Sequence, residues 1–167
     1  MRHRVMAKQQ NSQMCLVCGT ENKFGLQASF YELENSDLLA IFMPREEHQS
    51  YPGRLHGGIA TAILDETIGR AMMNTDQNFW GVTIEVTTRF RKPVPLEDEI
   101  RVVGRITKET SRYIEGTGEI LLKDGRVAVE GRGKYLKVPL DKITDSEFDE
   151  TEWKVIPSDD DPEYVEL

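Results

Sequence analysis

The clearest pattern of hydrophobic and polar positions lies between residues 57 and 73. Apolar side chains recur there at helical spacing and on most sides of the helix, at Ile59, Ala60, Ile63, Leu64, Ile68, Ala71 and Met72. A helix that is apolar nearly all round is buried in a protein core. The pattern therefore predicts one long buried helix over 57–73, in which the charged residues are Asp65, Glu66 and Arg70.

The segments on both sides of this helix have the pattern of strands. In "FWGVTIEVTTRF" (79–90) apolar and polar residues alternate. The alternation predicts one face with Trp80, Val82, Ile84, Val86 and Phe90, and a second face with Thr83, Glu85, Thr87 and Arg89. Further strands are predicted over 26–33, 37–44, 99–110, 112–124 and 126–138, with a hairpin turn at Asp124-Gly125.

This order of elements, two strands, one helix and four strands, predicts an α+β fold. We expect one long central helix wrapped by a roughly six-stranded, mostly antiparallel sheet. A single helix covers only part of such a sheet. The remaining apolar surface and the open strand edges therefore favour a dimer.

Charge divides the chain into three parts. Residues 141–167 hold eleven Asp and Glu against two Lys, whereas the whole chain has a net charge of −8. We therefore predict a flexible N-terminus at 1–14, one domain at 15–140 and a solvated acidic C-terminal tail at 141–167. The acidity argues against nucleic acid as a partner. The absence of a long apolar run argues against a membrane span, and the polar start does not resemble a secretory signal, so a cytoplasmic location is expected.

The two cysteines, Cys15 and Cys18, lie in "CLVCG". We expect them to be reduced, because a disulfide framework needs more cysteines. A zinc site needs four ligands and one C-x-x-C supplies two, so we interpret both thiols as packing residues and expect no metal. A metal shared between subunits is the alternative.

The helix start and its middle carry the candidate chemistry. Gly57 and Gly58 leave amides unshielded at the positive end of the helix dipole, where they can polarise a carbonyl oxygen; a tight turn or close packing would also explain them. Asp65 has no basic neighbour three or four residues away, whereas Glu66 has Arg70 four residues on and is expected to form a surface ion pair with it. An unpaired carboxylate in an apolar setting is costly and tends to mark function. The alternative is that Asp65 accepts hydrogen bonds from Thr61 or a neighbouring strand.

Helix geometry limits how Gly57 and Asp65 can act on the same substrate. Gly57 and Asp65 are eight residues apart, which is about 12 Å along one helix. If both act on one bond they must come from different subunits, so a catalytic role predicts sites at a dimer interface. Arg89, Arg91 and Lys92 form a basic patch that can bind phosphates, or that is simply a solvated strand end.

At these residues the sequence resembles the hotdog-fold acyl-CoA thioesterases, in their PaaI-like (phenylacetyl-CoA-type) branch. The resemblance lies in "YPGRLHGG", "HGGIATAILDE" and "GVTIEVTTRFRKPVP", with "CLVCGTENKFGLQASF" before them, and covers roughly residues 15–138. It implies a helix wrapped by an antiparallel sheet, dimers that often form tetramers, and hydrolysis of an acyl-CoA thioester without a cofactor.

The resemblance also implies roles for particular residues. Asp65 corresponds to the nucleophile or general base, and Gly57 to the amide that polarises the carbonyl from the opposite subunit. His56 and Gly58 are its neighbours, and Thr83 corresponds to a hydroxyl that orients water. Arg91 and Lys92 fall near where CoA phosphates lie.

One position departs from the family pattern. Relatives often carry Asn or Gln six residues before the His, in contact with the substrate or water, where this chain has Ser50 with Gln49 beside it. Either Gln49 supplies this contact through a shifted loop, or the contact is missing. The departure supports one alternative, a hotdog protein that binds an acyl ligand without turnover. A hotdog hydratase or dehydratase is a further alternative, and the spacing from "HGG" to Asp65 fits it less well.

Overall fold

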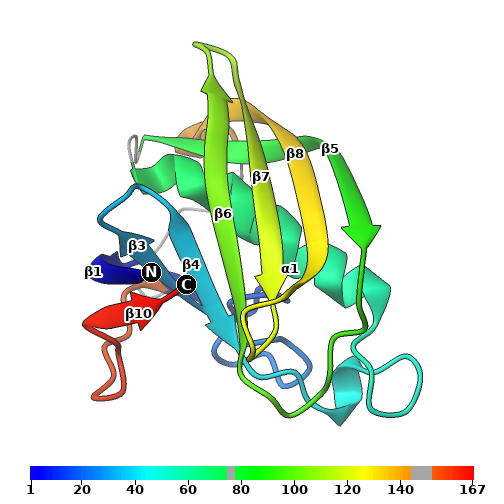
Figure 1. Ribbon diagram of the computed structural model, residues 1–167. Helices are drawn as coiled ribbons and strands as arrows, with labels where there is room; N and C mark the ends of the chain where they lie inside the picture. The colour runs from blue at the N-terminus through cyan, green and yellow to red at the C-terminus, as the bar shows by residue number, and fades with distance from the viewer. Residues whose placement is uncertain (75–77, 144–151) are drawn as a thin grey trace.

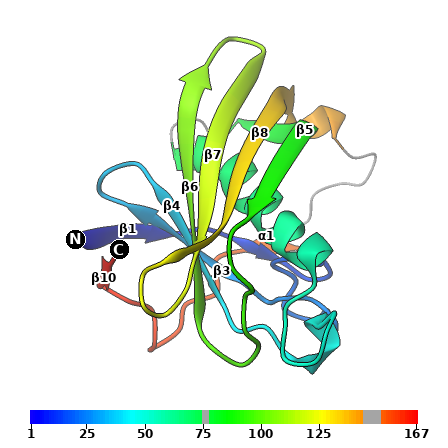
Figure 2. The same cartoon turned by 45° about the vertical axis from the view of Figure 1, so that its right-hand side comes forward.

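The structure is a computed structural model, and it describes residues 1–74, 78–143 and 152–167. One helix, α1 (Gly57–Arg70), lies against an antiparallel sheet of eight strands that curves around it (Figures 1 and 2). This confirms the predicted α+β class. The strand order is β10-β1-β3-β4-β6-β7-β8-β5, and a small second sheet pairs β2 with β9. No helix among the described residues is both long and apolar enough to cross a bilayer.

The strand bounds follow the predicted segments closely in the middle of the chain. The strands of this part of the chain are β3 (Ser29–Leu33), β4 (Leu38–Phe42), β5 (Phe79–Phe90), β6 (Ile100–Glu109), β7 (Tyr113–Leu121) and β8 (Val127–Pro139). Short 3₁₀ turns are η1 (Glu46–His48), η2 (Ala71–Asn74) and η3 (Leu140–Lys142). The helix predicted over 57–73 therefore ends three residues early and continues as η2. The predicted hairpin joins β7 to β8, where Gly125 takes a positive φ of 78°.

The core forms where α1 packs into the curve of the sheet. Ala60, Ile63, Leu64 and Ile68 are buried on the helix, as the apolar pattern predicted. Glycines on the facing strands make this close approach possible, because a Cβ at Gly118 would lie 2.9 Å from the Ile68 side chain. Any larger residue there would push the helix away from the sheet.

The structure differs from the prediction at both ends of the chain. Residues 1–14, expected to be flexible, contain β1 (Arg2–Lys8) and β2 (Asn11–Ser12). The acidic segment supplies β9 (Trp153–Lys154) and β10 (Tyr164–Glu166), while 144–151 lie outside the described residues. β1 pairs with both β3 and β10, so the sheet has eight strands and not about six. Neither end shows this in its own composition, because each strand is stabilised by a partner far away in the sequence.

The predicted faces of β5 are wrong beyond its midpoint. A bulge between Thr83 and Glu85 interrupts the register with β8. An extra residue in one strand moves the following side chains to the opposite face. Before the bulge, Thr83 contacts α1 and Val82 is exposed. Ile84, within the bulge, is exposed as well, and after the bulge Val86 packs into the core. β5 is also an edge strand, paired on one side with β8.

Candidate active site

The helix start is held by His56. This residue is the N-cap of α1, and its Nδ1 accepts a hydrogen bond of 2.9 Å from the Gly58 amide. Because Nδ1 is an acceptor, a neutral His56 ring carries its proton on Nε2. The cap satisfies the Gly58 amide within the chain. Gly57 is the first helical residue, and its amide belongs to the group that has no acceptor within a helix.

Asp65 lies two turns further along α1 and meets β5. The Thr83 hydroxyl donates to its Oδ1 over 3.0 Å, with Oδ2 at 3.3 Å. The neighbouring strand thus supplies the hydrogen bond, and Thr61 does not, because the Thr61 hydroxyl donates to the Gly57 carbonyl. The hydroxyl of Tyr135 in β8 donates to the main-chain carbonyl of Asp65 over 3.1 Å. Strands β5 and β8 therefore fix this turn of the helix.

Burial shifts the pKa of the Asp65 carboxyl. Partial burial raises the pKa of Asp65 above its usual value, and the neighbouring Glu66 carboxylate adds to the rise, while the hydrogen bond from Thr83 opposes it. A carboxylate with a raised pKa is a stronger base than one on an open surface. Asp65 therefore has the electrostatic setting of a general base.

A cavity of about 100 Å³ opens beside Asp65. It lies between the second half of α1 and the start of β5, and its walls also include Gly69, Met73, Trp80, Gly81, Tyr135 and Trp153. Aromatic side chains and the carboxylates of Asp65 and Glu66 line the same hollow, which suits an organic ligand with a polar reactive group. Sequence reasoning missed Tyr135 and Trp153, because both are distant in sequence and are brought here by the sheet.

The predicted Glu66–Arg70 pair is present, with Nε and Oε1 2.7 Å apart. The surface setting expected for it is wrong, since Arg70 is 5% exposed. Its guanidinium stacks on the rings of Phe30 and Trp153 and donates to the Gln10 carbonyl. The N-terminal segment and the tail cover this part of the helix and bury the pair.

The remaining predicted residues lie in the loop before α1 and after β5. The Gln49 side chain accepts from the Gly53 amide at 3.4 Å, and Ser50 is exposed. Arg91 is exposed and forms an ion pair of 2.9 Å with Glu130. The Phe90 ring lies against Gly57, which places the chain leading to Arg91 and Lys92 near the helix start. These residues lie near the Gly57 end of α1, whereas Asp65 lies about 12 Å further along the helix.

Comparisons with known proteins found similarity to thioesterases. Residues 52–129 match the model of the thioesterase superfamily. A curated relative is the mouse protein acyl-coenzyme A thioesterase 13, which is 25% identical over 96 residues, 57% of this chain and 69% of the mouse protein. Matches to the curated relatives cover between 55% and 69% of their lengths.

Solved structures agree on the fold. A thioesterase superfamily protein aligns with TM-score 0.68 and 26% identity over 73% of this chain and 59% of its own. The E. coli PaaI protein from the phenylacetic acid degradation operon aligns with TM-score 0.61 and 15% identity over 68% and 80% of the chains. A Streptococcus mutans protein bound to acetyl CoA aligns with TM-score 0.58 and 15% identity over 62% and 82%. Residues 52–129 therefore resemble the thioesterase superfamily, and the chain has the hotdog fold of these solved structures.

Proposed function

We propose that this protein hydrolyses an acyl-CoA thioester to a carboxylic acid and free CoA. The observation that carries the proposal is the partly buried Asp65 carboxylate, which accepts the Thr83 hydroxyl at the wall of a cavity. The name of the curated relative and the CoA-bound neighbour support CoA thioesters as the substrate class.

The two reacting groups come from different subunits in this proposal. Because Asp65 and Gly57 lie on one helix about 12 Å apart, they cannot reach one carbonyl from the same chain. A second copy that brings its Gly57 to this Asp65 solves the geometry, and two such sites then form by symmetry. The outer edge of β5 pairs with no other strand among the described residues, and Val82 and Ile84 are exposed there at 42% and 56%, which supports a dimer through this strand. The site requires a dimer and places no demand on further assembly into a tetramer.

The chemistry follows from these positions. The Asp65 carboxylate attacks the thioester carbon or removes a proton from the attacking water, and Thr83 orients the carboxylate or that water. Negative charge then develops on the carbonyl oxygen, where the Gly57 amide and the helix dipole stabilise it. The carbon–sulfur bond breaks and CoA leaves as a thiolate, which takes up a proton. Where Asp65 is the nucleophile, water then hydrolyses the acyl–Asp65 anhydride and releases the acid. Where Asp65 is the base, the water oxygen is already in the acid and Asp65 gives its proton back to solvent. His56 holds the turn that presents Gly57, so it is a positioning residue.

The CoA part of the substrate is assigned to the basic residues after β5. Arg91 and Lys92 follow Phe90, which touches the helix start, so a phosphate bound there lies near Gly57. A phosphate has to compete with Glu130 for the Arg91 guanidinium. We further propose that the protein acts in the cytoplasm.

A second candidate function is a protein that binds an acyl ligand without turnover. The loop before α1 favours it, because Ser50 has replaced the family amide and the Gln49 side chain is directed to the Gly53 backbone. In that case the site retains the ligand but lacks a contact that positions water.

The experiment that separates the two is thiol release from a panel of aliphatic and aromatic acyl-CoAs. The wild type is compared with Asp65→Asn and with Asp159→Asn, an exposed acid that does not line the cavity. Hydrolysis by the wild type and the control, with a loss of about a hundredfold or more in Asp65→Asn, supports the thioesterase. Tight acyl-CoA binding without thiol release by any of the three supports the binding protein.

A further inference from the structure

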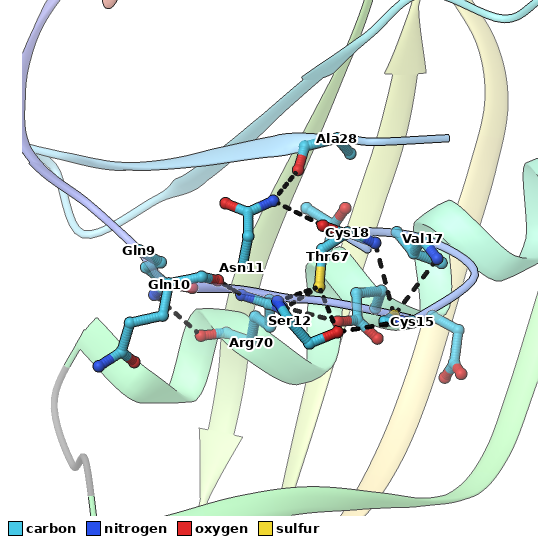
Figure 3. A network of polar contacts seen from close by, with 12 residues as sticks. Gln9, Gln10, Asn11, Ser12, Cys15, Val17, Cys18, Ala28, Thr67 and Arg70 are labelled. Carbon is cyan, nitrogen blue, oxygen red and sulfur yellow. Dashed lines mark hydrogen bonds and ion pairs between the residues drawn. The ribbon is translucent and has the colours of Figure 1, made fainter. Parts of the chain in front are cut away.

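Three groups that ligate metals meet beside α1. The sulfurs of Cys15 and Cys18 and a carboxylate oxygen of Glu66 all lie within 4.8 Å of one another. Cys18 is fully buried and Cys15 partly so, and neither forms a disulfide. The two cysteines come from a loop between β2 and β3, while Glu66 is on the helix next to Asp65. Figure 3 shows the loop side of this cluster against α1.

The loop is folded as a tight knuckle around Cys15. The Cys15 sulfur accepts the amides of Val17 and Cys18 at 3.3 and 3.4 Å (Figure 3). The Gly19 amide donates to the Cys15 carbonyl over 2.8 Å, and a Cβ at Gly19 would lie only 2.3 Å from that oxygen. Glycine is therefore required to close the knuckle. Amide donors aimed at a sulfur stabilise the thiolate, which is the form that binds metal.

Neighbouring polar groups hold the second cysteine in place. The Asn11 side-chain amide, itself buried, donates to the carbonyls of Cys18 and Ala28 at 2.8 and 2.9 Å. The Ser12 hydroxyl oxygen accepts the Cys15 amide and lies 3.9 Å from the Cys18 sulfur. The ligand groups are thus placed by the fold, as in a preorganised site.

We propose that Cys15, Cys18 and Glu66 form a binding site for a divalent metal that prefers thiolates, with Zn²⁺ as the best match. Two sulfurs and one carboxylate oxygen suit Zn²⁺, and a water completes a tetrahedron on the partly exposed side of Cys15. The fourth position makes this site exchangeable and distinguishes it from a closed four-ligand site. The sequence did not reveal it, because the third ligand lies 48 residues after Cys18 and is paired with Arg70.

The charges balance around such an ion. The Arg70 guanidinium lies 3.0 Å from the Cys18 sulfur and 2.7 Å from the Glu66 carboxylate. Two thiolates and one carboxylate then surround one divalent cation and one guanidinium, so the net charge of these five groups is zero. Arg70 thereby takes the position of an outer partner that orients two ligands.

Metal binding requires both sulfurs as thiolates. Any thiol proton on Cys15 or Cys18 therefore passes to solvent as the sulfur–metal bonds form.

The ion would link the N-terminal loop to the helix that carries Asp65. This proposal does not depend on the hydrolytic activity. Its test is titration of the reduced, metal-free full-length protein with Co²⁺, followed by ultraviolet and visible absorption. We expect about one equivalent to bind, with the sulfur-to-metal charge-transfer bands of thiolate ligands, and Zn²⁺ to displace it and abolish the bands.

Variants identify the ligands. Cys15→Ser is expected to lose the charge-transfer bands, and Glu66→Gln to weaken Co²⁺ binding at least about tenfold. The matched control is Glu115→Gln, which removes a surface carboxylate on β7 paired with Lys108. Circular dichroism checks that each variant is folded, and Cys18→Ser is avoided as the first choice because that side chain is fully buried.

Three results would overturn the proposal. The first is a folded, reduced wild type that shows no thiolate bands at saturating Co²⁺. The second is a Cys15→Ser variant that keeps them, and the third is a Glu66→Gln variant with unchanged affinity. If oxidised protein instead contains a Cys15–Cys18 disulfide and the reduced form binds no Co²⁺, the cluster is a redox pair and not a metal site.

Discussion

The Thr83 hydroxyl donates a hydrogen bond of 3.0 Å to the Asp65 carboxylate, joining the edge strand β5 to the middle of α1. This contact places a hydroxyl and a carboxylate at one wall of the cavity. It depends on the residues before the β5 bulge, which turn Thr83 toward the helix. The bond therefore links the position of the edge strand to the ionisation of Asp65.

Thr83→Val removes the hydroxyl and keeps the shape of the side chain. A hydrogen bond to a charged group is worth about 1.5–3 kcal/mol, so kcat/KM for acyl-CoA hydrolysis should fall between about tenfold and a hundredfold. The bond also lowers the pKa of Asp65, so its loss should raise that pKa and move the acidic limb of the pH–rate profile to higher pH. Thr87→Val, at an exposed position on the same strand, should leave both rate and profile unchanged. An unshifted profile in Thr83→Val would show that the hydroxyl does not act on Asp65.

The ionised Asp65 carboxylate should also lower the free energy of unfolding at neutral pH. Burial raises its pKa in the folded chain, so the folded state keeps this proton to a higher pH than the unfolded state does. The free energy of unfolding therefore decreases as pH rises through the interval between the two pKa values, and the full cost remains above it. Asp65→Asn should raise Tm at pH 7 relative to the wild type, and the difference should shrink once the wild-type carboxyl is protonated in both states. Thermal unfolding at pH 7 and at about pH 3, below the unfolded-state pKa, measures this. A variant with a lower Tm than the wild type at pH 7 would contradict it.

Gly57→Pro removes the amide assigned to the carbonyl oxygen and leaves the helix intact. Proline is well accepted at the first helical position, and His56, at φ −64° and ψ 134°, has the backbone conformation that precedes proline. Loss of one such donor should reduce kcat about a hundredfold. Mixing this variant with Asp65→Asn after subunit exchange should restore about a quarter of wild-type activity, because half of the dimers then contain one complete site. If the mixture stays as inactive as its components, the two groups do not meet across subunits.

His56→Ala should weaken the helix start. Loss of the N-cap acceptor for the Gly58 amide costs about 1 kcal/mol of stability. His56→Asn supplies a short acceptor and should recover most of that loss, so urea unfolding of the three proteins isolates the cap. In assays, His56→Ala should lower kcat more than His56→Asn does, since the cap positions Gly57. Equal activity in the two variants would argue against a positioning role.

The β5 edge should carry the dimer. Ile84→Lys places a charge in the exposed apolar part of this strand and should dissociate the dimer in analytical ultracentrifugation, with hydrolysis lost in parallel. Val155→Lys changes a side chain of similar exposure (46%) in the tail and should leave the assembly intact. A fully dimeric Ile84→Lys protein would place the interface elsewhere.

The sequence by itself determined the elements whose signals are local. The apolar repeat predicted α1 with Asp65 in it, alternation predicted β5 over 79–90, and Asp124-Gly125 predicted the β7–β8 turn. The spacing from "HGG" to Asp65 also indicated the superfamily. Each of these signals is short in range, because helix periodicity, strand alternation and turn preference act over a few residues.

Contacts between distant segments were decided only by the tertiary structure. Pairing of β1 with β10 ordered ends that looked flexible, and the β5 bulge moved Val86 to the helix side and left Val82 exposed. Glu66 shows the same limit, since the sequence paired it with Arg70 and the fold brought both to the two cysteines. Strand pairing, register and buried polar clusters depend on which surfaces meet in space, and no local pattern of side chains encodes that.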